Sequence, residues 1–278
     1  MQTSTKQTPQ THGAHGPAVE LTRVDVRFEA HLALEDVSVS IDPGLRVAVV
    51  GPNGAGKSTF FNLVSGLLAP TRGEVRVHGH APGQHLCLAY VTQANQLDWN
   101  FPVSVWDVAM MGRAGKLGLL RRPGAPDREL VRASLQRVGM LALADRQVGQ
   151  LSGGQRQRLF IARALAQEAD LLLLDEPFAG LDVPSQEQIL HILDDLRSQG
   201  VTVLFATHDL ELAAQKFDRI LLLNHRCVAY DIPAQALTQP NLSAAFGGHL
   251  QVVNTAQGPL VVGDSGGHHH HGAEGKHG

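Results

Sequence analysis

Long apolar runs and paired cysteines are missing from this chain of 278 residues. No stretch reaches the roughly 18 apolar residues that a membrane-spanning helix needs. Cys87 and Cys227 are the two cysteines, both lie in apolar runs, and no CxxC pair is present. We therefore expect buried, reduced thiols. Residues 1–17 also lack the apolar core of a secretory signal. These absences predict a cytosolic protein whose membrane role, if any, goes through a partner.

Neither sign of charge dominates, because 23 Lys and Arg face 26 Asp and Glu, and the net charge is −3 with histidine neutral. This balance does not indicate nucleic acid as a partner. Hydrophobic residues make up 43% of the chain and charged residues 18%, which is typical of a folded globular protein. The length suits one large domain or two small ones.

What the chain does contain is a glycine-rich segment between a predicted strand and a predicted helix. The apolar run at 47–50 predicts a buried strand, and the helical spacing of apolar residues at 60–67 predicts a helix. The residues between them read Gly51-Pro52-Asn53-Gly54-Ala55-Gly56-Lys57-Ser58-Thr59. Strand, glycine-rich turn, Lys-Ser and helix in this order indicate a phosphate-binding loop rather than a simple connecting turn.

The chemistry of this loop follows from its residue types. Glycines tolerate a positive φ, so the backbone can wrap closely around an anion. Successive N–H groups then point inward at the positive end of a helix dipole. The ammonium group of Lys57 can reach the β- and γ-phosphates of a nucleotide, and the Ser58 hydroxyl can ligate Mg²⁺.

Strands and helices alternate along the rest of the chain. Strands are predicted at 19–28, 33–41, 75–79, 86–93, 171–176 and 201–206, and a last hairpin at 219–230. This alternation predicts an α/β fold with a mostly parallel sheet covered on both faces.

Three segments depart from the alternation. A helical insertion is predicted with helices at 103–112 and 128–139, separated by Pro123-Gly124-Ala125-Pro126. Residues 1–17 are predicted to be a flexible polar tail, and the Gly- and His-rich residues 247–278 a disordered one.

Two carboxylates, Asp175 and Glu176, directly follow the apolar run 171–174. The carboxyl ends of strands are where α/β folds bind ligands. Asp175 could hold Mg²⁺, directly or through water, and Glu176 could deprotonate a water that attacks the γ-phosphorus. Alone, the pair would more simply be an acidic turn after a core strand, but the phosphate loop upstream favours the catalytic interpretation.

A second anion-binding turn is predicted at Ser152-Gly153-Gly154, where a hydroxyl, a glycine backbone and a helix N-terminus come together. Ser152 suits the N-cap position of the long amphipathic helix that follows. One nucleotide does not need two such sites from one subunit. The turn is therefore expected to complete the site of another copy, although in isolation a capped glycine turn without a ligand is the simpler interpretation.

His208 lies just beyond the predicted strand 201–206, between Thr207 and Asp209. It could donate a hydrogen bond to the γ-phosphate. A lone histidine is more often structural, but the position at a strand end favours a functional role.

Together these residues resemble the ATP-binding-cassette (ABC) ATPase family. The resemblance extends from about Val19 to Asp231 and includes, in family order, the phosphate loop, the signature Leu151-Ser152-Gly153-Gly154-Gln155 and the Walker B strand Leu171 to Glu176. It implies an ABC-type P-loop NTPase domain over 18–246, with an N-terminal antiparallel β subdomain and a helical subdomain at about 94–165. ATP and Mg²⁺ are the implied cofactors.

The resemblance also implies roles for individual residues. Phe28 matches the aromatic position that stacks on adenine, where Tyr is commoner but any ring can stack. Gln93 matches the Q-loop glutamine, which reaches the Mg²⁺ and the nucleophilic water and couples the site to transmembrane partners. Residues 179–182 resemble the D-loop, with Gly180 where Ser is usual, and Asp182 would lie across a dimer interface.

Members of this family work as head-to-tail dimers, with two ATP molecules between the phosphate loop of one subunit and the signature of the other. Closure on ATP and reopening after hydrolysis can drive membrane partners between two states. One cassette without a membrane span implies a separate ATPase subunit. It would form a homodimer on integral permease subunits, peripheral to the inner face of the plasma membrane, with a solute-binding protein as an indirect partner.

Segments 91–113 and 117–123 closely resemble the manganese/zinc/iron importer branch of the family. We therefore expect the ATP-hydrolysing subunit of an importer for one of these divalent metal ions. The alternatives are an importer for an iron chelate, cobalamin or small nutrient, and a soluble ABC ATPase that moves no solute.

The histidines at 268–271 offer a separate hypothesis, because imidazoles on a flexible tail could bind Zn²⁺. Such a tail could buffer or sense metal, or make the protein chiefly a metal-binding regulator. A remnant of an expression tag and an unselected low-complexity tail are the alternatives.

Overall fold

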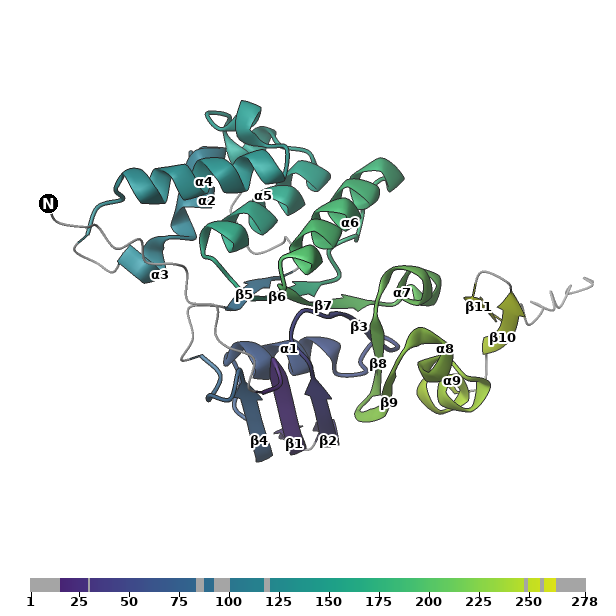
Figure 1. The fold of residues 1–278 in the computed structure, drawn as a ribbon. Coiled ribbons are helices and arrows are strands. Elements are labelled where there is room, and N and C mark those ends of the chain that lie inside the picture. Colours follow the sequence, from purple (N-terminus) through teal and green to yellow (C-terminus); the bar gives the residue numbers. More distant parts are fainter. Residues whose placement is uncertain are drawn as a thin grey trace, which may run out of the picture.

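The computed structural model describes most of the chain, and Figure 1 shows how its elements are arranged. The described residues are 16–29, 31–83, 88–92, 101–117, 121–247, 250–255 and 258–263. Gln93, the histidines at 268–271 and residues 1–15 of the predicted N-terminal tail lie outside them.

The N-terminal part forms a three-stranded antiparallel sheet with the order β2-β1-β4. Its strands are β1 (Val19–Phe28), β2 (His31–Ile41) and β4 (Arg72–Val77). In β1, residues such as Val19 and Leu21 are buried, while intervening residues face outward, because side chains on a strand alternate between its two faces.

The second sheet has six strands in the order β5-β6-β7-β3-β8-β9. They are β5 (Leu88–Val91), β6 (Leu171–Asp175), β7 (Thr202–Thr207), β3 (Arg46–Val50), β8 (Arg219–Asn224) and β9 (Arg226–Asp231). Adjacent strands from β5 to β8 pair in parallel, and only β9 pairs antiparallel, with β8. The predicted mostly parallel sheet is confirmed.

Two hydrophobic cores lie on opposite faces of this sheet, and β3 contributes to both. Val47 and Val49 pack into a core shared with the antiparallel sheet and helix α1 (Lys57–Ser65). Ala48 and Val50 pack into the other core, which is shared with the helices on the opposite side. A continuous apolar run therefore reflects burial of both faces of the strand.

A group of helices lies at the top of Figure 1, beyond the β5 edge of the six-stranded sheet. It contains α2 (Val105–Met111), α3 (Ala114–Leu117), α4 (Ala125–Arg137) and α5 (Gly153–Ala166), with short 3₁₀ turns η2 (Leu141–Leu143) and η3 (Val148–Gln150). Helix α6 (Val183–Ser198) lies beside α5.

The helix boundaries differ from the prediction at one informative place. Helix α4 begins at Ala125 rather than Arg128, so the last two residues of the predicted Pro-Gly-Ala-Pro spacer belong to its first turn. Pro126 fits there because a first-turn residue has no intrahelical partner for its N–H. Helix α2 begins after Ser104, whose hydroxyl accepts the Asp107 N–H while the Asp107 carboxylate accepts the Ser104 N–H.

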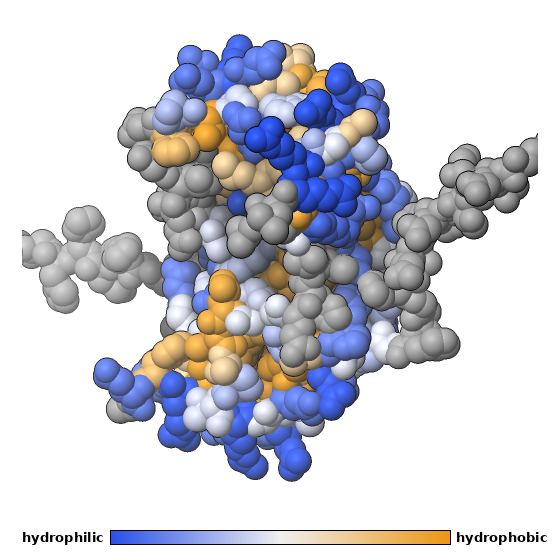
Figure 2. Space-filling model, turned by 90° about the vertical axis from the view of Figure 1, so that its left-hand side faces the viewer, coloured by the Kyte–Doolittle hydropathy of each residue, from blue (hydrophilic) through white to orange (hydrophobic). Residues whose placement is uncertain are grey.

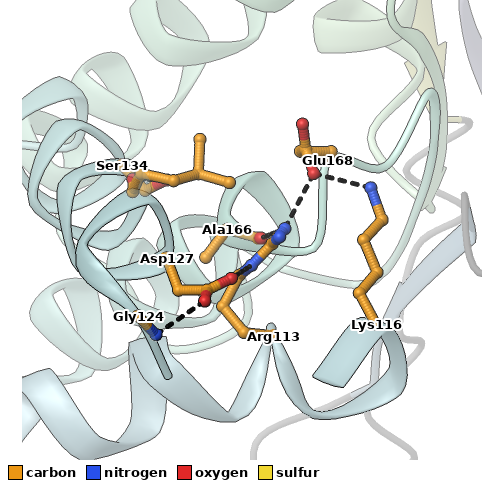
Figure 3. Close-up of polar contacts among 8 residues, drawn as sticks. Arg113, Lys116, Gly124, Asp127, Ser134, Ala166 and Glu168 are labelled. Atoms are coloured by element: carbon orange, nitrogen blue, oxygen red, sulfur yellow. Dashed lines mark hydrogen bonds and ion pairs between the residues drawn. The ribbon is translucent and has the colours of Figure 1, made fainter. Parts of the chain in front are cut away.

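A partly buried arginine, Arg113, ties these helices together, as Figure 3 shows. Arg113 follows α2, and its Nε donates to Asp127 Oδ1 on α4 at 3.0 Å. Its Nη1 donates to the carbonyl of Ala166, the last residue of α5, at 2.9 Å and to Glu168 Oε2, just beyond that helix, at 2.7 Å. Lys116 Nζ on α3 donates to the same Glu168 oxygen at 2.6 Å.

The second carboxylate oxygen of Asp127 accepts the backbone N–H of Gly124 at 2.9 Å. This hydrogen bond is the main cause that lowers the pKa of Asp127, and the Arg113 guanidinium adds to it. The carboxylate thus caps α4 and pairs with Arg113 at the same time. We call Arg113, Lys116, Asp127 and Glu168 the helical charge cluster.

Helix α7 (Leu210–Lys216) connects β7 to β8, and the short helices α8 (Pro233–Ala236) and α9 (Gln239–Phe246) follow β9. Beyond them, β10 (Leu250–Thr255) pairs antiparallel with β11 (Gly258–Gly263). Both strands lie within the tail predicted from the sequence to be disordered, 247–278. The prediction used the overall Gly, Gln and His content of the tail. It did not consider two short runs of β-branched and apolar residues, 252–253 and 260–262, which favour a hairpin.

On the face drawn in Figure 2, hydrophilic residues cover most of the helical region, and a hydrophobic patch lies lower, at the height of α1 and the antiparallel sheet. In the described part of the chain, no helix combines the length and the apolar composition needed to cross a bilayer.

Candidate functional site

The glycine-rich loop lies between β3 and α1, as predicted, and two of its glycines cannot be replaced without a clash. A Cβ on Gly51 would lie 2.1 Å from the carbonyl oxygen of Leu223 on β8. Gly56 has φ +96°, and a Cβ there would lie 2.6 Å from Leu34 Cδ2 on β2. Glycine therefore allows the loop to pass closely between the two sheets.

Lys57 is the first residue of α1, and its side chain folds back into the loop. Its Nζ donates to the carbonyl oxygens of Gly51, at 2.8 Å, and Pro52, at 3.2 Å. The residue is only 7% exposed. Burial lowers the pKa of Lys57, while the nearby carboxylates of Glu176 and Asp175 act in the opposite direction. The loop thus holds a nearly buried ammonium group. An anion bound in the loop could replace the two carbonyl oxygens as the acceptor of its hydrogen bonds.

Asp175 ends β6 and Glu176 follows it, so both carboxylates lie at the carboxyl edge of the sheet. Glu176 Oε1 is 3.9 Å from Lys57 Nζ and 4.0 Å from His208 Nδ1. These separations exceed a direct hydrogen bond but are short enough for electrostatic interaction between the groups. The structure therefore brings together three residues that the sequence predicted separately.

Glu176 adopts φ +47°, a left-handed conformation that is rare for a residue with a β-carbon. Its N–H donates to the carbonyl of Ala206 on β7 at 3.2 Å, and its own carbonyl accepts the N–H of Ala179. Such backbone conformations cost of order 1–3 kcal/mol and persist where surrounding contacts enforce them. The turn thereby directs the Glu176 side chain toward Lys57 rather than along the strand.

His208 follows β7, the strand next to β6, which explains its approach to Glu176. Its side chain is 72% exposed. The adjoining Asp209 caps α7, because its carboxylate accepts the N–H of Leu212 at 2.9 Å. The turn that presents His208 is thus fixed by a helix cap while the imidazole remains accessible to a ligand.

Sequence reasoning missed Tyr90, which lies on β5 beside β6. Its hydroxyl donates to Asp175 Oδ2 at 3.2 Å. Burial is the main cause that raises the pKa of Tyr90, and the Asp175 carboxylate raises it further, so the hydroxyl stays protonated as a donor. The alternation of β5 signals that Tyr90 and Leu88 share a face, but not that Asp175 lies across from them.

A cleft of about 390 Å³ is lined by Lys57, Asp175 and Glu176, whereas His208 and Tyr90 contact these residues from outside the lining. One part of its lining is residues 53–59 of the loop with Asp175 and Glu176. The other part is Phe28, which is 48% exposed, with His31 and Ala33 from the neighbouring strand. A cleft with backbone donors and a cation beside an exposed aromatic ring suits a molecule with both phosphates and a flat ring.

The signature turn is not among the residues that line this cleft. Ser152 accepts the N–H of Gln155 through its hydroxyl at 3.3 Å, and its own N–H donates to Gln155 Oε1 at 3.0 Å, which confirms it as the N-cap of α5. A Cβ on Gly154 would lie 2.4 Å from Ser185 Oγ on α6, so this glycine permits close helix packing.

Asp182 precedes α6 as its N-cap residue, and it too does not line the cleft. Gln93 lies outside the described residues. Of the predicted site residues, the structure therefore gathers Phe28, the phosphate loop, Asp175, Glu176 and His208, and keeps Ser152 to Gln155 and Asp182 apart from them.

The Ser58 hydroxyl and the Asp175 carboxylate, which the sequence predicted as Mg²⁺ ligands, both belong to the lining of the cleft. No group of three or more His, Cys, Asp or Glu side chains suited to a metal occurs among the described residues. Two oxygen donors fit Mg²⁺, which takes few protein ligands and fills its octahedron with phosphate oxygens and water.

A phosphate loop between a parallel strand and a helix, with two carboxylates at the end of the Walker B strand β6 in the same sheet, defines a P-loop nucleoside triphosphatase. Residues 34–179 match the family described as ABC transporter. The chain belongs to this family as an ATP-binding, ATP-hydrolysing cassette.

The relatives of the chain narrow this class. It is 46% identical over 243 residues to the manganese transport system ATP-binding protein MntA of Synechocystis, with 83% of this chain and 93% of that protein covered. It is 43% identical over 234 residues to the zinc transport system ATP-binding protein TroB of Treponema pallidum, with 84% and 88% covered.

Solved structures agree on the fold. A metal-chelate type ABC transporter in an inward-facing conformation matches with a TM-score of 0.75 and 30% identity, over 88% of this chain and 96% of that one. An ATP-binding cassette in its ADP conformation matches with a TM-score of 0.73 over 84% of this chain and 100% of that one, at 23% identity, which speaks to the fold alone.

Proposed function

We propose that this chain is the ATP-hydrolysing subunit of an importer for manganese, zinc or iron ions. The observation that carries the ATPase part is the cleft in which Lys57, Asp175 and Glu176 meet the phosphate loop. The metal cargo rests on the relatives, which include manganese and zinc transport ATP-binding proteins and YfeB of Yersinia pestis, a chelated iron transport system protein at 44% identity.

In this proposal the adenine ring stacks on Phe28, and the triphosphate lies on the N–H groups of residues 53–59. Lys57 exchanges its carbonyl partners for the β- and γ-phosphate oxygens. Ser58 and Asp175 would hold Mg²⁺, which neutralises charge on the phosphates when bound. Tyr90 orients the Asp175 carboxylate toward that position.

Glu176 is the proposed general base. Its carboxylate, 3.9 Å from the Lys57 ammonium, takes a proton from the water that attacks the γ-phosphorus. His208, 4.0 Å from the same carboxylate oxygen, donates a hydrogen bond to the γ-phosphate. Gln93 is proposed to reach the same region from the segment that follows β5.

Completion of the site requires a second copy of the chain. The signature turn has a helix N-terminus and a capping serine but does not line its own cleft. We propose a head-to-tail homodimer in which Ser152 to Gln155 contacts the ATP of the partner, with Asp182 at the interface. The dimer would dock on integral permease subunits at the cytoplasmic face of the membrane, supplied indirectly by a solute-binding protein.

The experiment is metal accumulation in cells that lack this gene, complemented with wild type or Glu176→Gln. The proposal expects reduced uptake of manganese, zinc or iron, rescued by wild type and not by the variant. Normal accumulation of all three metals in a strain without other importers would overturn the metal assignment. Rescue by Glu176→Gln would overturn the requirement for hydrolysis.

A further inference from the structure

The turn between β8 and β9 contacts residues that line the nucleotide cleft, although it belongs to none of the motifs found in the sequence. His225 in this turn has φ +56°. Its backbone N–H donates to the carbonyl of Ala55, within the phosphate loop, at 2.9 Å. Its backbone carbonyl accepts the N–H of Glu35 on β2 at 2.8 Å. The backbone of one residue therefore contacts both the phosphate loop and the antiparallel sheet.

The imidazole of His225 adds a second contact with β2. Its Nδ1 is 3.1 Å from the carbonyl oxygen of Ala33. A carbonyl can only accept, so Nδ1 carries the proton in this contact. The ring also packs edge to face against His31, with centroids 5.8 Å apart and an interplanar angle of 82°.

These contacts fall on residues that line the cleft. Ala33 and His31 belong to its lining, and so does Phe28, which pairs with His31 across the β1–β2 hairpin. Directly paired residues project from the same face of a sheet. The edge that carries the aromatic ring belongs to the antiparallel sheet, whereas the phosphate loop extends from the six-stranded sheet. The nucleotide has to contact both at a fixed separation.

We propose that His225 is a positioning residue for nucleotide binding. Its backbone holds the phosphate loop, and its imidazole holds β2, so the Phe28 edge is fixed relative to the loop before a nucleotide arrives. Loss of the imidazole leaves the two backbone hydrogen bonds intact and releases Ala33 and His31. The inference deepens the proposed function, because it assumes that ATP occupies this cleft.

Loss of the His225 imidazole should weaken binding of ATP but not binding of tripolyphosphate. ATP uses both edges of the cleft, whereas inorganic tripolyphosphate uses only the phosphate loop. His225→Ala should therefore raise the Kd for ATP roughly three- to tenfold, the range expected from one lost hydrogen bond and its ordering effect. The Kd for tripolyphosphate should stay within about twofold. In ATPase assays KM should rise while kcat at saturating ATP is retained.

The test is calorimetric titration of the full chain with MgATP and with magnesium tripolyphosphate, for wild type and three variants. His225→Asn places an amide donor near the Nδ1 position and tolerates positive φ, so it should restore ATP affinity to within about twofold. His191→Ala, at an exposed position on α6, should leave both affinities unchanged. Thermal unfolding of each variant checks that it is folded.

Equal weakening of ATP and tripolyphosphate by His225→Ala, or unchanged ATP affinity, would overturn the proposal. So would a failure of His225→Asn to restore binding while the variant remains folded. Failure of the nucleotide site itself gives a different result: wild type would then not bind ATP, or Lys57→Ala would bind both ligands as wild type does.

Discussion

The chain contains two clusters of charged side chains that look alike in composition and differ in geometry. In the helical charge cluster, Arg113 and Lys116 lie 2.6–3.0 Å from the carboxylates of Asp127 and Glu168 (Figure 3). In the cleft, Lys57 and His208 approach Glu176 only to 3.9 and 4.0 Å. The first cluster pairs its charges through direct hydrogen bonds, whereas the charged groups of the second are close but not hydrogen-bonded to one another.

The pKa shifts follow the same division. Hydrogen bonds to Glu168 and Asp127 raise the pKa of Arg113 against the effect of burial, and the pKa of Glu168 is lowered by Lys116 and Arg113 although burial acts against them. In the cleft, burial lowers the pKa of Lys57 and is the larger effect. A buried charge held by close carboxylates stabilises a fold, whereas Lys57 is held by two carbonyl oxygens that a ligand anion can replace.

The largest expected effect comes from the cleft. Glu176→Gln removes the proposed base and keeps the shape, so kcat should fall by about 10²–10⁴-fold. ATP binding should persist and trap the closed dimer, which size-exclusion chromatography with ATP would detect. Glu187→Gln makes the same chemical change at an exposed position on α6 and should keep the wild-type rate. Rapid turnover by Glu176→Gln would exclude this residue as the base.

Substitutions in the helical charge cluster should lower the free energy of unfolding rather than the rate of ATP hydrolysis. Arg113→Met keeps most of the side-chain volume but leaves Asp127, which is 4% exposed, without its guanidinium partner. We expect the free energy of unfolding to fall by about 2–4 kcal/mol in urea titrations. Arg132→Met, which loses an exposed pair with Glu129, should cost less than about 1 kcal/mol. Similar losses for both variants would contradict the structural role of Arg113.

The smallest expected effect is a pH dependence of the stability that Asp127 contributes. The folded state lowers the pKa of Asp127, chiefly through the Gly124 N–H. Its contribution to stability is therefore present above the unfolded pKa of about 4 and is lost as pH falls toward the folded value. Asp127→Asn should cost about 1–2 kcal/mol at pH 7, and the difference from wild type should shrink below about pH 4.

Urea titrations from pH 3 to pH 7 measure this difference. Asp145→Asn, at an exposed position after η2, serves as the matched control and should follow the wild-type profile. A penalty for Asp127→Asn that does not change with pH would mean that its charge is not what matters at this position.

Much of the nucleotide site could be predicted because it is local in sequence. The nine residues from Gly51 to Thr59 and the pair Asp175 and Glu176 each follow an apolar strand, and that context identifies them. The parallel sheet was predictable for the same reason, since β3, β6 and β7 are short, almost continuous apolar runs.

The contacts that were missed join residues far apart in the chain. Tyr90 and Asp175 are 85 positions apart, and His225 and Ala33 are 192 apart. Strand order places β5 beside β6, and the β8–β9 turn beside β2. No spacing rule within one segment encodes such neighbours. The left-handed φ of Glu176 is likewise set by surrounding contacts and not by the preference of glutamate.

The sequence by itself determined the class of chemistry, because the phosphate loop and the Walker B carboxylates are local patterns with direct physical meaning. Only the tertiary structure decided how the charges are used. In the helical charge cluster, distances of 2.6–3.0 Å show that the charged groups pair directly and hold helices together. In the cleft, distances of 3.9–4.0 Å show that the charged groups do not hydrogen-bond one another, which suits binding of a ligand. Electrostatic energy depends on separation and burial, and both are properties of the folded chain.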